Sequence, residues 1–308
     1  MKRIEFHAMG SRMMAAVESP SPQAELALQR LPAWFEDWEQ VLSRFRPDSE
    51  LSRLNRQAGQ PVAVSETLWE VFQAAREAER RTGGLVTATV MDAVLSAGYD
   101  ASFELLSAVQ PASVWSLPEP IDPLASVGWD PSGRILELPA SVHLDLGGIA
   151  KGWAASKAAS RLARYGPALV DAGGDIAVGR PLPGGQPWPV GIGDPFQPGT
   201  DFETLKLQKC GIATSGKDYH RWLRDGRWVH HIIDPRTGLP ADTDVLASTV
   251  VAPTALEAEA AAKTALILGS LSGLEWIDSD PALAGVLVLE NGTRLYSARM
   301  DRYLWRAS

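Results

Sequence analysis

The sequence has a single cysteine among its 308 residues, which excludes an internal disulfide and any metal site built from several cysteines. Cys210 precedes the apolar run Gly211-Ile212-Ala213, so we expect a buried structural thiol. No apolar stretch is long enough to cross a bilayer, which argues against stable membrane insertion. The first residues also lack the apolar run of a signal peptide, and we therefore expect a cytoplasmic location.

Basic residues are fewer than acidic ones, 29 against 37, and the net charge is −8. This balance argues against a nucleic-acid-binding surface. Neither of the two common nucleotide-binding glycine motifs occurs, and the Gly-x-Ser-x-Gly elbow of serine hydrolases is absent. The hydrophobic fraction of 45% is that of a folded protein with a sizeable core.

Hydrophobic periodicity and turn residues predict a mixture of helices and strands. We expect helices over residues 23–43, 67–82, 153–164 and 254–269. We expect strands over 4–17 (two, around Met9-Gly10-Ser11), 143–146, 168–172, 204–213, 228–233, 284–289 and 293–297. Proline and glycine predict a loop over 179–199, and the pattern over 86–130 gives no order of elements. Strands and helices do not alternate strictly, so the predicted fold class is α+β.

The most informative segment is His-Leu-Asp-Leu-Gly-Gly-Ile-Ala-Lys-Gly at residues 143–152. It predicts a short strand, a glycine turn, and a helix with Lys151 in or just before its first turn. A lysine there adds to the partial positive charge of the helix N-terminus, which is unfavourable by itself. A bound anion makes the same arrangement favourable. With free N–H groups nearby, the segment is typical of a phosphate site. The alternative is an ordinary strand–turn–helix with a solvated lysine.

Three further groups of polar residues carry possible chemistry. His230 and His231 face opposite sides of a predicted strand, so one faces a site as a proton acceptor, unless both are structural. Asp171 and Asp175 flank two glycines, for which a turn is the simpler interpretation. On the helix over 254–269, Glu259 and Lys263 lie four residues apart on one face.

The position of Lys263 distinguishes two interpretations of that pair. A surface ion pair contributes only ~0.3–0.5 kcal/mol. Lys263, however, falls within an apolar stripe, and the rest of this helix is mostly alanine and leucine. A helix that is apolar nearly all round is usually buried. The pair is therefore either a costly structural pair or part of the lining of a polar cavity, which we favour.

Taken together, these segments resemble the ApbE family of FAD:protein FMN transferases over nearly the whole chain, taken as one domain of residues 1–308. The resemblance rests on motifs in the family's order: Met9-Gly10-Ser11, Ser43-Arg44-Phe45 through Ser49 and Leu51 to Asn55, residues 145–152, Gly173-Gly174-Asp175, Thr214-Ser215-Gly216 and residues 231–238. It implies a two-lobed fold with FAD bound between the lobes. Family members are often exported.

The resemblance also implies a reaction and the residues for it. FMN would move from FAD to a threonine hydroxyl of an acceptor flavoprotein, AMP would leave, and His231 would take the threonine proton. Such phosphoryl transfer depends on positioning and charge neutralisation. The positions that match the family's flavin contacts are Met9, Phe45, Leu85, Val86, Thr87, Asp145, Lys151 and Ile232.

The sequence departs from the family at the magnesium site. The resemblance implies ligands at Gly148, through its backbone oxygen, and at two positions four apart on the late helix. Here these two are Glu259 and Lys263, in place of an aspartate and a threonine, and a protonated lysine cannot bind a metal ion. Thr87 likewise lies where many relatives have an acid. Three functions remain open: FMN transfer with little or no metal, FAD binding without transfer, and FAD hydrolysis with water as the acceptor.

Overall fold

The computed structural model describes residues 1–101, 109–110, 120–219, 221–224 and 226–306. Its contacts divide the chain into two compact units. Unit 1 comprises Met1–Phe35, Lys151–Asp218 and Thr243–Ser308, and unit 2 comprises Glu36–Ala150 and Tyr219–Asp242. In the ranges described, no helix combines the length and the apolar character that spanning a membrane requires. Strands and helices are mixed, so the predicted α+β class is confirmed.

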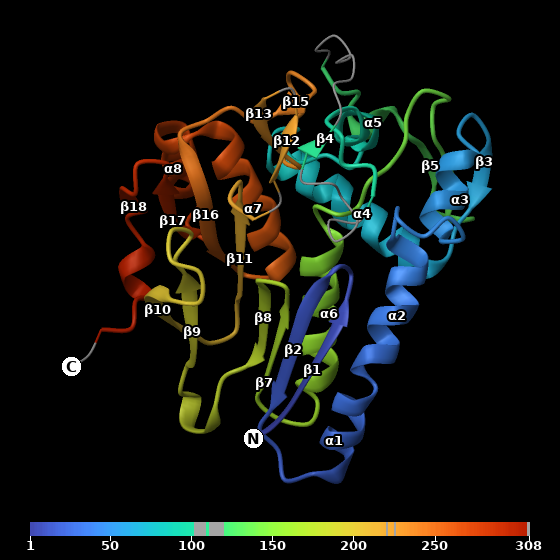
Figure 1. The fold of residues 1–308 in the computed structure, drawn as a ribbon. Helices are drawn as coiled ribbons and strands as arrows, with labels where there is room; N and C mark the ends of the chain where they lie inside the picture. Colours follow the sequence, from blue (N-terminus) through green and yellow to red (C-terminus); the bar gives the residue numbers. More distant parts are fainter. Residues whose placement is uncertain (102–108, 111–119, 220, 225, 307–308) are drawn as a thin grey trace. The chain divides into compact units, whose positions relative to one another are not determined.

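Unit 1 is built on an eight-stranded sheet in which every neighbouring pair is antiparallel. Figure 1 shows its strands running from the N-terminal hairpin to the C-terminal segment. In spatial order they are β1 (Lys2–Ala8), β2 (Ser11–Val17), β7 (Ala168–Ala172), β8 (Asp175–Arg180), β11 (Gly211–Gly216), β16 (Val245–Ala252), β17 (Ala284–Leu289) and β18 (Arg294–Tyr296).

The two faces of this sheet are covered differently. Ile212 and Val251 belong to a core shared with a separate hairpin, β9 (Trp188–Gly193) and β10 (Asp201–Leu207). Neighbouring residues of a strand point to opposite faces. The other face of β11 and β16 meets helix α7 (Ala255–Leu268), and α7 in turn packs on α8 (Ser270–Ser279).

Glycines set how closely the helices approach the sheet. A Cβ atom at Gly211 would lie 2.1 Å from the Ala255 nitrogen, so only glycine lets β11 lie against the start of α7. A Cβ atom at Gly179 of β8 would lie 2.6 Å from the carbonyl oxygen of Ala159 in helix α6 (Ala150–Leu162). The two helices that carry Lys151 and Glu259 are thus fixed against the same sheet.

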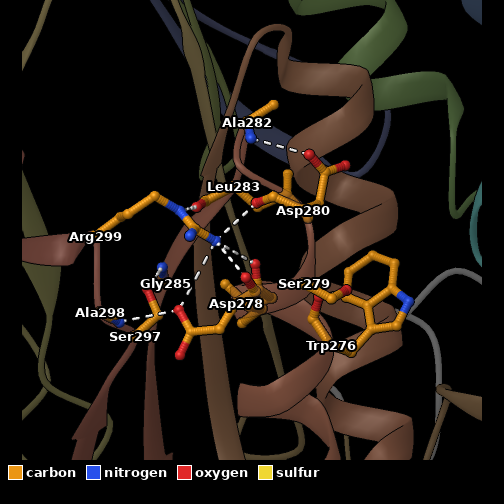
Figure 2. Close-up of polar contacts among 11 residues, drawn as sticks. Trp276, Asp278, Ser279, Asp280, Ala282, Leu283, Gly285, Ser297, Ala298 and Arg299 are labelled. Carbon is orange, nitrogen blue, oxygen red and sulfur yellow. Dashed lines mark hydrogen bonds and ion pairs between the residues drawn. The ribbon is translucent and has the colours of Figure 1, made fainter.

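Arg299 stabilises the end of α8 (Figure 2). Its guanidinium group donates hydrogen bonds of 2.8–3.0 Å to the carbonyl oxygens of Ile277, Asp278, Asp280 and Leu283. The last carbonyl groups of a helix have no partner within the helix, and Arg299 supplies one from the segment after β18. Beside it, the Asp278 carboxylate accepts the N–H of Ala298 at 3.0 Å.

Unit 2 contains shorter helices and strands. Ser49 and Ser65 accept hydrogen bonds from backbone N–H groups and begin α3 (Glu50–Arg56) and α4 (Glu66–Arg81), as expected of serine caps. Trp222 is the centre of a core with α5 (Met91–Ser96). The strands are β3 (Pro61–Ala63), β4 (Val109–Gln110), β5 (Gly128–Asp130), β6 (Ile135–Glu137), β12 (Arg221–Arg224), β13 (Arg227–His230), β14 (Ile233–Asp234) and β15 (Leu239–Pro240).

Five expected elements are wrong. The strands expected over 204–213 and 228–233 are each interrupted, the first between β10 and β11 and the second between β13 and β14. Residues 23–43 form two helices, α1 (Pro22–Gln29) and α2 (Leu31–Leu42), because Pro32 lacks the N–H that a continuous helix needs. The predicted loop over 179–199 contains β9. Residues 143–146 are not a strand. The Leu144 N–H donates to Oδ1 of Asn55 at 2.8 Å, and Nδ2 of Asn55 donates to the Leu144 carbonyl oxygen at 2.9 Å. The Asn55 side chain thus takes the place that a neighbouring strand would have. Part of the unassigned stretch 86–130 lies outside the described residues.

Candidate functional site

Glu259 is the centre of a buried charged cluster in unit 1. Thr254 begins α7 by accepting the N–H of Glu257, and Glu259 lies one turn further along and is only 3% exposed. One carboxylate oxygen, Oε2, accepts the Gly152 N–H at 3.0 Å. The other, Oε1, lies 3.7 Å from the Nζ atom of Lys263. The carboxylate thus joins the start of α6 to the lysine one turn later on α7.

Gly152 is required at this junction between the helices. A Cβ atom there would lie 2.7 Å from the carbonyl oxygen of Ala255 and 2.9 Å from Oε2 of Glu259. Both distances are shorter than the structure can accommodate without a shift. The hydrogen bond also shows that the Gly152 N–H, near the predicted phosphate site, already has an anionic partner within the chain.

Lys151 and Asp175 form the second ion pair of the cluster. The Nζ atom of Lys151 lies 3.3 Å from Oδ2 of Asp175, which is 3% exposed at the start of β8. The turn before it contains Gly173 and Gly174 at φ of 69° and 97°, and the Gly174 N–H donates to Asp171 at 2.7 Å. The turn predicted for this segment is therefore present, and it places Asp175 beside Lys151.

Burial perturbs two carboxyl groups in this part of the molecule. Burial, followed by the nearby charge of Asp175, raises the pKa of Glu259 to about 7, against the opposing effects of Lys263, Lys151 and the Gly152 N–H. Burial also raises the pKa of Asp171. Strongly perturbed groups of this kind are typical of functional sites.

The side chains of this cluster do not fit a divalent cation. Both oxygens of Glu259 have partners, one being the ammonium group of Lys263, and an ammonium group has no lone pair for a metal. Among the described residues, no group of three or more His, Cys, Asp or Glu side chains could hold a metal ion. Gly148, the other predicted ligand, belongs to unit 2. Magnesium binding at Gly148 and Glu259 therefore stays a prediction, which the donor atoms of Glu259 and Lys263 do not support.

Asp145 is the centre of the candidate site in unit 2. Its side chain lies 2.9 Å from the Nε atom of Arg44 and also accepts the Gly147 N–H at 2.7 Å. The Arg44 side chain is buried, and that of Asp145 is mostly buried. The backbone N–H of Asp145 donates to the carbonyl oxygen of Ala88 at 2.7 Å. These contacts fix the conformation of the Asp-Leu-Gly-Gly segment, although it belongs to no helix or strand at Asp145.

Arg44 also connects Asp145 to a group of aromatic rings. Its guanidinium group lies over the rings of Phe45 and Tyr99, 4.0 and 4.8 Å from their centroids, and donates to the Tyr99 carbonyl at 2.8 Å. The Tyr99 ring lies 6.0 Å from the ring of His231. Phe45, at 40% exposed, remains accessible for stacking on a planar ligand.

The two histidines have different environments, although not for the expected reason, because β13 ends at His230 and His231 lies beyond it. His230 is buried, its Nδ1 accepts the Ile232 N–H at 3.2 Å, and its Nε2 donates to the Ala241 carbonyl at 2.9 Å. This fixes His230 as a neutral structural residue. His231 follows β13, is only partly buried and lies beside Tyr99, so it is the candidate for chemistry.

The remaining predicted contacts are divided between the units. Val86, Thr87 and Ile232 are buried in unit 2, whereas Leu85 is partly exposed. The Thr87 hydroxyl is 2.8 Å from that of Thr89. In unit 1, Met9 lies in the two-residue turn between β1 and β2 at φ 48°, a conformation that favours Gly, Asn or Asp.

Sequence reasoning missed Arg44 and Tyr99 as site residues. Arg44 was visible beside Phe45 in a recognised motif, but only the structure shows its ion pair with Asp145. Tyr99 lies in the stretch for which the pattern predicted no elements. For Asp175, the turn was predicted but its pairing with Lys151 was not.

Known proteins resemble this chain over most of its length. A family model described as the ApbE family matches residues 9–287. A relative named FAD:protein FMN transferase from Treponema pallidum is 33% identical over 280 residues, covering 85% of this chain and 77% of that protein. One of the same name from Salmonella typhimurium is 30% identical over 268 residues, covering 83% and 74%.

Solved structures show the same fold. An ApbE protein from Thermotoga maritima has a TM-score of 0.88 at 24% identity and covers 99% of both chains. The flavin transferase ApbE from Vibrio cholerae has a TM-score of 0.79 at 24% identity, covering 98% of this chain and 99% of that one. The match of the family model across most of the sequence establishes that this chain belongs to the ApbE family.

Proposed function

We propose that the protein transfers FMN from FAD to a threonine hydroxyl of an acceptor flavoprotein and releases AMP. The observation that carries the proposal is the similarity, over more than four fifths of the chain, to relatives named FAD:protein FMN transferase. Each unit, taken by itself, also supports the proposal: the charged cluster of unit 1 offers ammonium groups suited to a diphosphate, and the aromatic group of unit 2 offers a ring suited to stacking on a flavin.

In the proposed reaction the threonine oxygen attacks the phosphorus of the FMN half. The bond between that phosphorus and the oxygen of the AMP half breaks, and AMP leaves. His231 accepts the threonine proton, because His230 uses both ring nitrogens in structural hydrogen bonds. A histidine suits this task since its ordinary pKa lies near neutrality.

Lys151 and Lys263 contribute positive charge toward the diphosphate, whose negative charge increases on the leaving oxygen. In unit 2, Phe45 stacks on the flavin and Arg44 holds Phe45 and Asp145 in place. Met9, Leu85, Val86, Thr87 and Ile232 are the further positions proposed to contact FAD.

The test is incubation with FAD and a threonine-bearing acceptor protein, with in-gel flavin fluorescence and AMP release as readouts. We expect both products, and we expect His231→Gln to slow transfer by roughly 10²- to 10⁴-fold while FAD affinity stays within about 3-fold. His7→Gln, an exposed histidine on β1, is the matched control.

Other results would identify the alternatives. AMP without attached flavin, across several acceptors, would indicate FAD hydrolysis. FAD binding without AMP release would indicate a binding protein that has lost transfer.

A further inference from the structure

The charged cluster around Glu259 has its negative charges inside and its positive charges toward solvent. The side chains of Glu259 and Asp175 are each only 4% exposed, whereas those of Lys263 and Lys151 are 16% and 28% exposed. A ligand that approaches this cluster therefore meets ammonium groups before it meets carboxylates. Such a surface attracts an anion and repels a divalent cation.

Glu259 contacts Lys263 directly and the backbone next to Lys151. Its Oε1 lies 3.7 Å from Nζ of Lys263, and its Oε2 accepts the N–H of Gly152, the residue directly after Lys151. Lys151 is fixed a second time by Asp175, 3.3 Å away. The missing Cβ at position 152 allows α6 and α7 to meet this closely. The two cations come from different helices and have different carboxylate partners, and Glu259 joins the two helices through Gly152.

We propose that the ammonium group of Lys263, positioned by Glu259 and acting with Lys151, binds the diphosphate of FAD in place of a divalent metal ion, so that FAD binding does not require metal. This inference rests on the proposed function. In it, Lys263 and Lys151 are binding residues, and Glu259 and Asp175 are positioning residues. A positive charge at Lys263 also explains why a divalent metal ion fits poorly here, because the position four residues after Glu259 offers an ammonium group instead of an oxygen ligand.

The test is equilibrium binding of FAD to the full chain, with either excess Mg²⁺ or a strong chelator. Riboflavin, which has no phosphate, serves as the comparison ligand. We expect the wild type to bind FAD with the same affinity, within about 2-fold, in both conditions. Lys263→Met should weaken FAD binding roughly 10- to 100-fold and leave riboflavin binding unchanged. Lys263→Arg should retain FAD binding, also in chelator, because the charge is kept.

Lys209→Met is the matched control, since Lys209 is an exposed lysine of unit 1 before β11. The inference is overturned if chelator weakens wild-type FAD binding by 10-fold or more, or if Lys263→Met behaves like the control. Absence of FAD binding in both conditions overturns both proposals. Metal-independent FAD binding without any flavin transfer contradicts only the proposed function, whereas flavin transfer that depends on Mg²⁺ for FAD binding contradicts only this inference.

Discussion

Replacing Glu259 by glutamine should remove a pH dependence of stability that this buried carboxyl group confers. Its pKa is raised to about 7 in the folded protein, against an ordinary value of 4.5 in the unfolded chain. Between these values the folded state keeps a proton that the unfolded state has released, so a rise in pH favours unfolding. The stability present below pH 4.5 is lost as the pH rises through 7.

The magnitude follows from the difference between the two pKa values. Each pKa unit corresponds to about 1.4 kcal/mol, so the full effect is roughly 3 kcal/mol. Between pH 5 and pH 8 we expect about 2–3 kcal/mol. Glutamine has the shape of the protonated acid and can still accept the Gly152 N–H, but it does not titrate. The free energy of unfolding of wild type minus Glu259→Gln should therefore fall by that amount from pH 5 to pH 8.

Urea unfolding followed by tryptophan fluorescence measures this difference, and subtraction removes the contributions of other titrating groups. Glu275→Gln, which makes the same chemical change at an exposed site on α8, is the control and should give a constant difference. If the difference for Glu259→Gln stays constant within about 0.5 kcal/mol, Glu259 is not protonated near neutrality and the reasoning is wrong.

Three other variants test separate features. Gly152→Ala should destabilise the protein by ~1–3 kcal/mol in urea unfolding and weaken FAD binding, because its Cβ would lie 2.7 Å from the Ala255 carbonyl oxygen; unchanged stability would show that the helices can separate. Arg299→Met should cost about 2–4 kcal/mol and lower the melting temperature, since it leaves several carbonyl groups without their donor. Glu259→Asp combined with Lys263→Thr should make FAD binding respond to Mg²⁺, as oxygen ligands replace the ammonium group; calorimetry with and without chelator decides.

The regular parts of the fold were predictable because their signals are local. The helix α7 begins at Thr254 and ends before Gly269 at φ 81°, both of which are visible as a cap and a stop signal. The strand β7 matched its prediction to the residue. Each of these elements has one periodicity between clear boundary residues.

Elements that depend on distant partners were not predictable in this way. Residues 143–146 have the alternation of a strand, yet the Asn55 side chain, 89 residues away in the sequence, provides the hydrogen bonds of Leu144. The same applies to the site: Lys151 pairs with Asp175 and Arg44 with Asp145 only because the fold brings them together. In each of these ion pairs, tertiary structure and not sequence distance determines which residues meet.

The protonation of Glu259 also decides how much positive charge the cluster offers to a ligand. With Glu259 ionised, Lys151 and Lys263 are balanced by Glu259 and Asp175, and the four groups carry no net charge. With Glu259 protonated, they carry one net positive charge. A diphosphate should therefore take up a proton on binding, and FAD should bind more tightly at pH 6 than at pH 8. Glu259→Gln should lose most of this dependence, while a pH profile equal to that of the wild type would show that the diphosphate does not bind beside Glu259.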